Sequence, residues 1–294
     1  MLKTVVFGYG NVGRRAADAC RSSGDMLLAG IVDPAFAGRT EGDVKIVSSP
    51  EELPGFEAAI LALPSRMVPD AAAGLLQKGV LTADAYDIHG DIPEVRARLD
   101  DIARAAGAVA VLAAGWDPGA DSIVRALMEA MAPQGITYTD FGPGMSMGHS
   151  VAARAIPGVK EALSLTLPAG AGLHRRMVYV ELANGYALSD VSAAIKADGY
   201  FTHDETHVVA VDSVAALRDV GHGVNIERKG VSAGAHNQRF KYDMLIHGPA
   251  VTAQILVCAV RAAARQAPGC YTMIEIPPAD FLEMSREEAV KRLV

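Results

Sequence analysis

Residues 5–13 read Val5-Val6-Phe7-Gly8-Tyr9-Gly10-Asn11-Val12-Gly13, an apolar, β-rich run that passes directly into the pattern G-x-G-x-x-G. A helix-like stretch, Arg14–Ser22, follows at once. Glycines at these three places allow a tight turn, close approach of the backbone to a pyrophosphate, and close packing of helix on strand. The start of the helix adds unpaired N–H groups and a partial positive charge. The alternative is a plain glycine turn without a ligand. We instead predict a dinucleotide-binding turn in which residues 8–13 contact the cofactor.

The second β-rich run, Leu27–Val32, ends at Asp33, about 20 residues after the last glycine of the pattern. Rossmann-type folds place there the acid that binds the adenosine ribose. A carboxylate accepts hydrogen bonds from the ribose 2′-hydroxyl and repels a 2′-phosphate, and Pro34 adds no compensating cation. We therefore expect NAD to be preferred over NADP. Two alternatives stay open, because Arg39 is a nearby cation that could reverse the preference, and Asp33 could simply cap a loop.

Short apolar runs alternate with helical patterns as far as residue 113. Further β-rich runs lie at Ala58–Leu63, Leu81–Ala83 and Val109–Ala113, and helical stretches lie at Val68–Gln77 and Asp91–Ala106. This alternation predicts an α/β fold with a Rossmann-type, doubly wound parallel sheet and helices on both faces. Among the candidate cofactor-binding residues we include four that lie at or after these runs: Leu63, Pro64, Ser65 and Tyr86.

From Gly115 the character of the sequence changes. Glycine and proline cluster at 115–119 and 142–144; alternating runs follow at Met177–Leu182, Val208–Val211 and Phe240–Ile246, with helical stretches at Ser189–Ala197 and Pro249–Arg265. Alternating runs are typical of an open sheet with one covered face. We therefore expect an α+β second domain over residues 116–266, built on an open mixed sheet. Residues 1–115 form the first domain, to which residues 267–294 return.

Length and charge narrow the class of protein. A chain of 294 residues predicts two domains, and 27 Lys and Arg against 34 Asp and Glu give a charge of −7. That balance, without a basic run, argues against nucleic acid or a membrane as a partner. No apolar stretch approaches the roughly 18 residues of a membrane helix, and no leader is evident, so we expect a cytoplasmic protein. The three scattered cysteines, and the spacing of His203 and His207, indicate no metal site.

Two acidic residues follow neighbouring strands. Asp87 comes after the Leu81–Ala83 run, and Asp117 comes after the Val109–Ala113 run, within Gly115-Trp116-Asp117-Pro118-Gly119. Carboxylates brought together at this edge of a sheet attract an ammonium group, and their repulsion and partial burial raise their affinity for a proton. Either residue alone is explained about as well by a turn.

Three strings make the chain similar to a known family. They are the Gly115–Gly119 string, Phe141–Ser150 (FGPGMSMGHS) and Ile156–Val159 (IPGV). With residues 8–13 and 269–272, they resemble meso-diaminopimelate dehydrogenase over nearly the whole chain. The resemblance implies a homodimer with a Rossmann domain and a substrate-binding and dimerisation domain. It also implies oxidation of the D-configured centre of meso-2,6-diaminopimelate, with a nicotinamide cofactor, to L-2-amino-6-oxopimelate (tetrahydrodipicolinate when cyclised) and ammonia, and the reverse reductive amination, on the lysine pathway.

The resemblance also implies residue roles. Asp87 and Asp117 hold the amino group of the reacting centre, and either is the candidate base that frees the amine for hydride departure. Trp116 and Phe141 lie beside that centre; without the resemblance both are explained equally simply as core aromatics. The remaining substrate contacts are Met147, Gly148, His149 and Ser150 along the substrate, and Thr166, Arg176 and His222 at the distal L centre. On their own, Arg176 is typical of a solvated charge and His222 of a turn.

Two positions depart from the family. NADP is its usual cofactor, and one or two arginines usually follow the second strand, where this chain has Asp33 and Pro34. The family also places an Asn before the proline that opens the late helix, in contact with the distal end of the substrate, and Gly248 stands there. His247 or water could replace that amide. The loss leaves room for a D-amino acid dehydrogenase of relaxed specificity.

Two other classes stay open. A dihydrodipicolinate-type reductase acts on a C=N bond and shares the cofactor domain, but its histidine-rich string is not found here. A nucleotide-sensing protein could keep the same fold without catalysis. The combination of Asp87, Asp117 and Arg176 argues against that second class. We therefore expect an amino acid dehydrogenase that acts on CH–NH2 of a small molecule.

Overall fold

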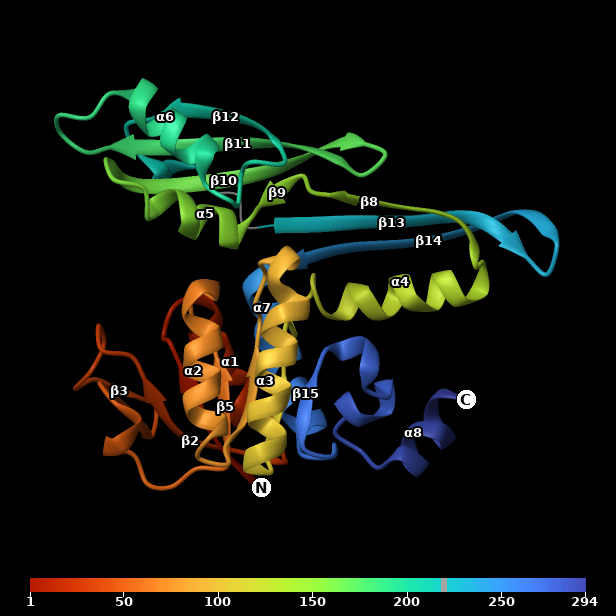
Figure 1. Ribbon diagram of the computed structural model, residues 1–294. Coiled ribbons are helices and arrows are strands. Elements are labelled where there is room, and N and C mark those ends of the chain that lie inside the picture. The colour runs from red at the N-terminus through yellow and green to blue at the C-terminus, as the bar shows by residue number, and fades with distance from the viewer. Residues whose placement is uncertain (218–220) are drawn as a thin grey trace. The chain divides into compact units, whose positions relative to one another are not determined.

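The computed structural model describes residues 1–217 and 221–294. The chain divides into two compact units, unit 1 over Met1–Ile123 and Pro249–Val294, and unit 2 over Val124–Gly248 (Figure 1). From the sequence we place residues 249–266 in the second domain, whereas here they belong to unit 1. The physical reason is that the apolar side chains of this segment, Leu256 and Val260 among them, are buried in a core of unit 1.

Unit 1 is built on one sheet, whose described strands follow the order β15-β7-β6-β5-β1-β2-β4-β3. Neighbouring strands are parallel except β3 and β4. Continuous apolar runs such as β5 are typical of parallel strands that are covered on both faces. The predicted α/β class with a parallel sheet is confirmed. The strand bounds are β1 Leu2–Phe7, β2 Met26–Val32, β3 Thr40–Glu41, β4 Val44–Val47, β5 Ala58–Leu61, β6 Leu81–Asp84, β7 Val109–Val111 and β15 Gly269–Tyr271.

Helices cover both faces of this sheet (Figure 1). Side chains alternate along β1, so Val6 packs with residues of α1 and α7, while Val5 and Phe7 pack with residues of α2 and α3. Because these strands are parallel, their carboxyl ends meet at one edge of the sheet, which is where such sheets bind ligands. The helix bounds in unit 1 are α1 Asn11–Ser22, α2 Val68–Leu76, α3 Ile92–Ala106, α7 Gly248–Ala263 and α8 Arg286–Leu293. Helix α4, Ala120–Met131, begins in unit 1 and continues into unit 2.

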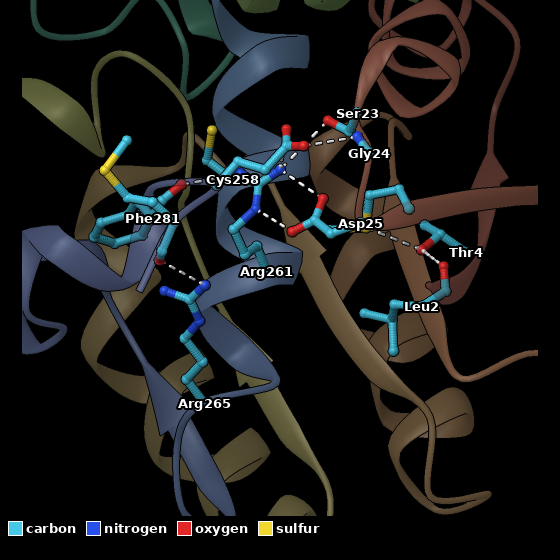
Figure 2. A network of polar contacts seen from close by, with 12 residues as sticks. Leu2, Thr4, Ser23, Gly24, Asp25, Cys258, Arg261, Arg265 and Phe281 are labelled. Carbon is cyan, nitrogen blue, oxygen red and sulfur yellow. Dashed lines mark hydrogen bonds and ion pairs between the residues drawn. The ribbon is translucent and has the colours of Figure 1, made fainter. Parts of the chain in front are cut away.

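The segment after α7 returns to the sheet, because β15 pairs in parallel with β7. Figure 2 shows how α7 is fixed nearby. Arg261, only 5% exposed, donates to both carboxylate oxygens of Asp25 at 2.5 and 2.9 Å. It also donates to the Phe281 carbonyl at 3.0 Å and to the Ser23 hydroxyl at 3.3 Å. A buried guanidinium needs such partners, and these tie three distant segments of the chain together.

Unit 2 distributes its described strands over two sheets, where the sequence predicts one. The order β12-β11-β10-β9 is mixed, because β11 and β12 are parallel, and the order β14-β13-β8 is antiparallel. Ala152 of α5 and Ile195 of α6 pack with Val178 and Val180 of β11. The bounds are β8 Gln134–Phe141, β9 Gly144–Met145, α5 Met147–Arg154, β10 Val159–Gly170, β11 Leu173–Leu182, α6 Leu188–Ala197, β12 Glu205–Ala210, β13 Gly221–Ser232 and β14 Ala235–His247.

Short 3-10 helices complete the described chain. They are η1 Pro50–Glu52, η2 Ser65–Met67, η3 His89–Asp91, η4 Val214–Ala216, η5 Met273–Glu275 and η6 Pro278–Phe281. Within residues 1–217 and 221–294, no helix has the length and apolar character that crossing a membrane requires.

Candidate active site

The glycine turn after β1 has the shape that a pyrophosphate needs. A Cβ on Gly8, whose φ is +91°, would lie 2.3 Å from the Ala62 carbonyl oxygen, and one on Gly13 would lie 1.9 Å from the Gly8 oxygen. At Gly10 nothing lies within 4 Å of that position, so the turn is open on this side. Helix α1 begins at Asn11 with no acidic residue in its first turn, which suits an anion.

Asp33 joins the end of β2 to this turn. Its Oδ2 accepts the Tyr9 N–H at 2.7 Å, and its Oδ1 accepts the Ala35 N–H at 2.9 Å. Asp33 thus does cap its loop. Each carboxylate oxygen nevertheless keeps a lone pair that can accept a hydrogen bond from a ribose hydroxyl. The Tyr9 side chain is buried and contacts the Phe36 ring edge-on at 5.5 Å.

Two arginines contact the Phe36 ring beside this acid. The guanidinium carbon of Arg14 lies 5.2 Å from the ring centre, and that of Arg39 lies at the same distance. The sequence singles out Arg39 as a nearby cation, and the structure adds Arg14. The adenosine end of the candidate site therefore combines one carboxylate with two cations held on an aromatic ring.

The segments after β5 and β6 meet. Leu63 lies beside the glycine turn, because a Cβ on Gly8 would be 3.4 Å from its Cδ2. Ser65, at the start of η2, donates its hydroxyl to Asp87 Oδ1 at 2.5 Å and accepts the Asp87 N–H at 3.3 Å. A predicted cofactor residue thus contacts a predicted catalytic carboxylate. The Tyr86 side chain is buried, which raises its pKa to about 12, and Pro64 is exposed.

A buried carboxylate links the segments that carry Asp87 and Asp117. Asp84, at the end of β6, has no exposed surface, and its Oδ1 accepts the N–H groups of Tyr86 and Ala113, both at 3.0 Å. Its carbonyl oxygen accepts the Ala114 N–H at 2.6 Å. Burial raises the pKa of this carboxyl to about 6, against the lowering effect of the two N–H donors.

The string 115–119 forms a closed turn before α4. The Gly115 N–H donates to the Pro118 carbonyl at 3.0 Å, and the Gly115 carbonyl accepts the Ala120 N–H at 3.1 Å. A Cβ on Gly119 would lie 1.9 Å from the Gly115 oxygen, which explains the glycine at that place. Trp116 and Asp117, at the tip of the turn, are both half-buried.

In unit 2, two predicted distal contacts are cross-strand neighbours. Thr166 of β10 pairs with Arg176 of β11, and the Arg176 guanidinium donates to the Thr166 hydroxyl. The same guanidinium donates through Nε to Asp204 at 2.6 Å. Arg176 is therefore a buried, paired cation and not a solvated charge. His222 is buried as well, with Nδ1 donating to the Gly223 carbonyl at 2.9 Å.

The other predicted substrate contacts of unit 2 are held by polar and aromatic neighbours. The Phe141 N–H donates to His174 Nε2 at 2.8 Å, and burial lowers the pKa of that imidazole. His149 lies in the first turn of α5, after Met147 and Gly148. Its Nδ1 shares a hydrogen bond of 2.8 Å with the Ser146 hydroxyl, and its ring packs edge-on against Phe201.

The Ser150 hydroxyl makes structural hydrogen bonds within unit 2. Its hydroxyl donates to the Ser146 carbonyl at 2.7 Å and accepts the Ser164 N–H at 2.9 Å, so it holds α5 on β10. Gly248 is the first residue of α7 and is buried. The roles of these residues in binding stay predictions.

Three polar residues of the site were not predicted: Asp84, His174 and Asp204. Asp84 alone had a signal in the sequence, because a carboxylate that ends an apolar strand requires a buried partner. In the part of the chain that the structure describes, no cluster of three His, Cys, Asp or Glu side chains could hold a metal ion.

Comparison with known families identifies a match over the central part of the chain. Residues 115–247 match the family described as "Diaminopimelic acid dehydrogenase C-terminal domain". Among characterised proteins, the meso-diaminopimelate D-dehydrogenase of Bacteroides fragilis is 51% identical over 296 residues, which cover 100% of this chain and 99% of the relative. The enzyme of the same name from Corynebacterium glutamicum is 30% identical over 94% of each chain.

Two solved structures resemble this one over 100% of its chain and 99% of theirs. The C. glutamicum DAP dehydrogenase in complex with DAP superposes with a TM-score of 0.88 at 28% identity. An engineered D-amino acid dehydrogenase bound to NADP+ superposes with a TM-score of 0.88 at 27% identity.

Proposed function

The chain belongs to the meso-diaminopimelate D-dehydrogenase family, and from this we propose that it oxidises the D-configured centre of meso-2,6-diaminopimelate. The α-carbon loses a hydride to a nicotinamide dinucleotide and a water oxygen replaces its nitrogen. The products are L-2-amino-6-oxopimelate, which cyclises to tetrahydrodipicolinate, ammonium, the reduced cofactor and one proton. The reverse reductive amination uses the same groups. The strongest support is the 51% identity along the full chain.

The residues of unit 1 fit a dinucleotide. The open side of the turn at Gly10 and the uncrowded start of α1 suit a pyrophosphate, and Asp33 suits a ribose. When bound, the cofactor supplies the hydride acceptor. Leu63 and Ser65 lie beside the turn and beside Asp87, so the same edge of the sheet serves cofactor and substrate.

Asp87 and Asp117 carry the proton chemistry in this proposal. Their negative charges attract the substrate ammonium, and one of them takes a proton from it, because hydride leaves only from a neutral amine. The carboxylate that stays ionised then stabilises the positive charge of the substrate iminium. The hydroxyl of Ser65 orients the Asp87 carboxylate. In unit 2, Arg176 offers a guanidinium for the distal carboxylate, with Asp204 and Thr166 holding it in place.

A spectrophotometric assay tests the proposal. The purified chain is mixed with meso-diaminopimelate or with L,L-diaminopimelate, and formation of reduced nicotinamide is followed. We expect turnover of the meso compound alone, because the L,L compound has no D centre. A panel of other D-amino acids measures the range of substrates that the chain accepts. No turnover of the meso compound by folded protein with either cofactor would overturn the proposal, and equal turnover of the panel would replace it by a D-amino acid dehydrogenase of relaxed specificity.

We also propose that NAD is the better cofactor, because the carboxylate of Asp33 lies where a 2′-phosphate would have to bind. Arg14 and Arg39 act against this preference. The test is kcat/KM with each cofactor for the natural chain and for Asp33→Asn, which keeps an acceptor oxygen and removes the charge. We expect a higher kcat/KM with NAD, and a shift toward NADP in the variant. A large advantage of NADP in the natural chain would contradict the proposal.

From the same resemblance we propose three further properties: a homodimer, a cytoplasmic location and a place in lysine biosynthesis. Light scattering of the purified chain measures its mass in solution. A mass of one chain would contradict the homodimer.

A further inference from the structure

Asp84 is a buried carboxylate that the proposed chemistry does not use. It ends β6, which lies between β5 and β7 in the sheet, and it has no exposed surface. Strand alternation places its side chain on the same face as Thr82, opposite to Ala83. Acidic side chains are rarely buried so completely unless they have partners, because desolvation disfavours the ionised form.

The hydrogen bonds of Asp84 extend the contact between two strands beyond the point where their pairing ends. The last paired residues of β6 and β7 are Ala83 and Val111. Past them, Asp84 Oδ1 accepts the N–H groups of Tyr86 and Ala113, and its carbonyl accepts the N–H of Ala114. Tyr86 directly precedes Asp87, and Ala114 directly precedes the turn that carries Asp117.

The backbone conformation of Ala113 indicates that the hydrogen bonds of Asp84 constrain this segment. Its φ is +58°, in the left-handed region that residues with a side chain seldom adopt. Such a conformation persists only where the surroundings fix it. Asp84 accepts two bonds that do so: its side-chain Oδ1 accepts the Ala113 N–H, and its backbone carbonyl accepts the Ala114 N–H. Together they set the direction in which the chain enters the 115–119 turn.

We propose that Asp84 is a positioning residue, which fixes the segments of Asp87 and Asp117 relative to one another through one acceptor oxygen. Its catalytic consequence rests on the proposed function. The other oxygen, Oδ2, has no hydrogen-bond partner among the described residues. The essential feature is therefore the acceptor at Oδ1 and not the negative charge, and an amide in place of the carboxylate preserves it.

The sole tryptophan of the chain reports on this role without any substrate, because Trp116 lies in the turn itself. We compare Asp84→Ala, which removes the acceptor, with Asp84→Asn, which keeps it. Thr82→Val is the matched control, because Thr82 is equally buried on the same face and its hydroxyl has no partner in the described chain. We expect acrylamide to quench Trp116 more strongly in Asp84→Ala only. Melting temperatures, measured in parallel, separate this local change from unfolding.

Kinetics with meso-diaminopimelate test the catalytic consequence. We expect kcat of Asp84→Ala to fall by about 10²-fold, the size that a shift of about 1 Å at the reacting groups produces. The KM for the cofactor stays unchanged, and Asp84→Asn and Thr82→Val keep most of the natural kcat. If the natural chain does not turn over, the proposed function fails, and the tryptophan measurement still decides the role of Asp84.

Two results would overturn the inference. One is natural quenching of Trp116 in Asp84→Ala, and the other is an Asp84→Asn variant as impaired as Asp84→Ala. If Asp84→Ala does not fold, Ala113→Gly is added to it, because glycine relieves the left-handed strain, and the same measurements are made on the double variant. Even without the double variant, stronger quenching of Trp116 in folded Asp84→Asn than in the natural chain would overturn the inference.

Discussion

The two regions of unit 1 that we propose to face cofactor and substrate are shaped by opposite means. The turn at residues 8–13 depends on missing side chains, since a Cβ at Gly13 would lie 1.9 Å from a backbone oxygen. The segments of Asp87 and Asp117 depend on a side chain that is present, the buried carboxylate of Asp84. Steric exclusion fixes the backbone of the first region, and hydrogen bonds to Asp84 fix that of the second. Substitutions should therefore act through packing in the first region and through hydrogen bonding or charge in the second.

The largest effect is expected at Gly13. Gly13→Ala forces a methyl group into the Gly8 carbonyl, so we expect the free energy of unfolding in urea to fall by about 3 kcal/mol, the upper end of the usual cost of overpacking. Gly74→Ala is the control, because nothing lies within 4 Å of a Cβ there and alanine favours the exposed α2 position. Equal stability of the two variants would remove the steric account of the turn.

A pH-dependent effect is expected at Asp84. Its carboxyl pKa of about 6 in the fold lies above the roughly 3.9 of an unfolded aspartate, so the folded state binds the proton more tightly. The stability from this group is complete below about pH 4 and is lost as the pH rises through 6. Relative to the natural chain, Asp84→Asn should gain about 3 kcal/mol over that window.

Urea titrations of both chains at several pH values measure this difference. Burial also raises the pKa of the two neighbours Tyr86 and Cys270, which stay neutral throughout. A difference in stability that does not change between pH 4 and 7 would contradict the account.

At Asp117 the change is chemical. Asp117→Asn removes a charge and a proton acceptor, and we expect kcat to fall by about 10²-fold, as for other acid–base residues. Asp101→Asn, on the exposed side of α3, serves as the control. Near-normal turnover by Asp117→Asn would refute its assignment.

The smallest effect, at Gly10, separates binding from folding. Its φ is −77° and space surrounds the Cβ position, so Gly10→Ala folds as well as the natural chain. The added methyl group still hinders a pyrophosphate, and we expect the cofactor to bind about tenfold more weakly, about 1.4 kcal/mol. Calorimetric titration with the cofactor measures this. Unchanged affinity would place the pyrophosphate elsewhere.

Much of unit 1 was predictable from the sequence. Strands β1, β2, β5 and β6 were found within two or three residues, because fully buried parallel strands form continuous apolar runs. Strand β4, four residues between loops, was missed, and so was α4, which follows a stretch rich in glycine and proline. Local composition decided these cases, and tertiary packing overrides it.

In unit 2 the long strands β10 and β13 were missed. In β13, Glu227, Arg228 and Lys229 resemble a solvated surface, yet Arg228 is buried and donates to the Ala132 carbonyl. A charged residue that is satisfied by a distant carbonyl cannot be recognised from its neighbours in sequence.

The candidate site divides in the same way. Asp87 and Asp117 could be proposed because strand ends mark the ligand edge of the sheet, and the structure adds the contact of Asp87 with Ser65. Asp204 could not be proposed, because its pairing with Arg176 joins residues that lie 28 positions apart.

The bonds of Arg261 to Asp25 and Phe281 have a consequence for how the protein is made. A ribosome synthesises all of residues 124–248 before it reaches α7, so the nascent amino-terminal sheet has neither this arginine nor the edge strand β15. At about 5–20 residues per second, that wait is on the order of 6–25 s. During it, the apolar surface of β1 and β2 that α7 later covers lies open, and a chaperone has its best opportunity to bind.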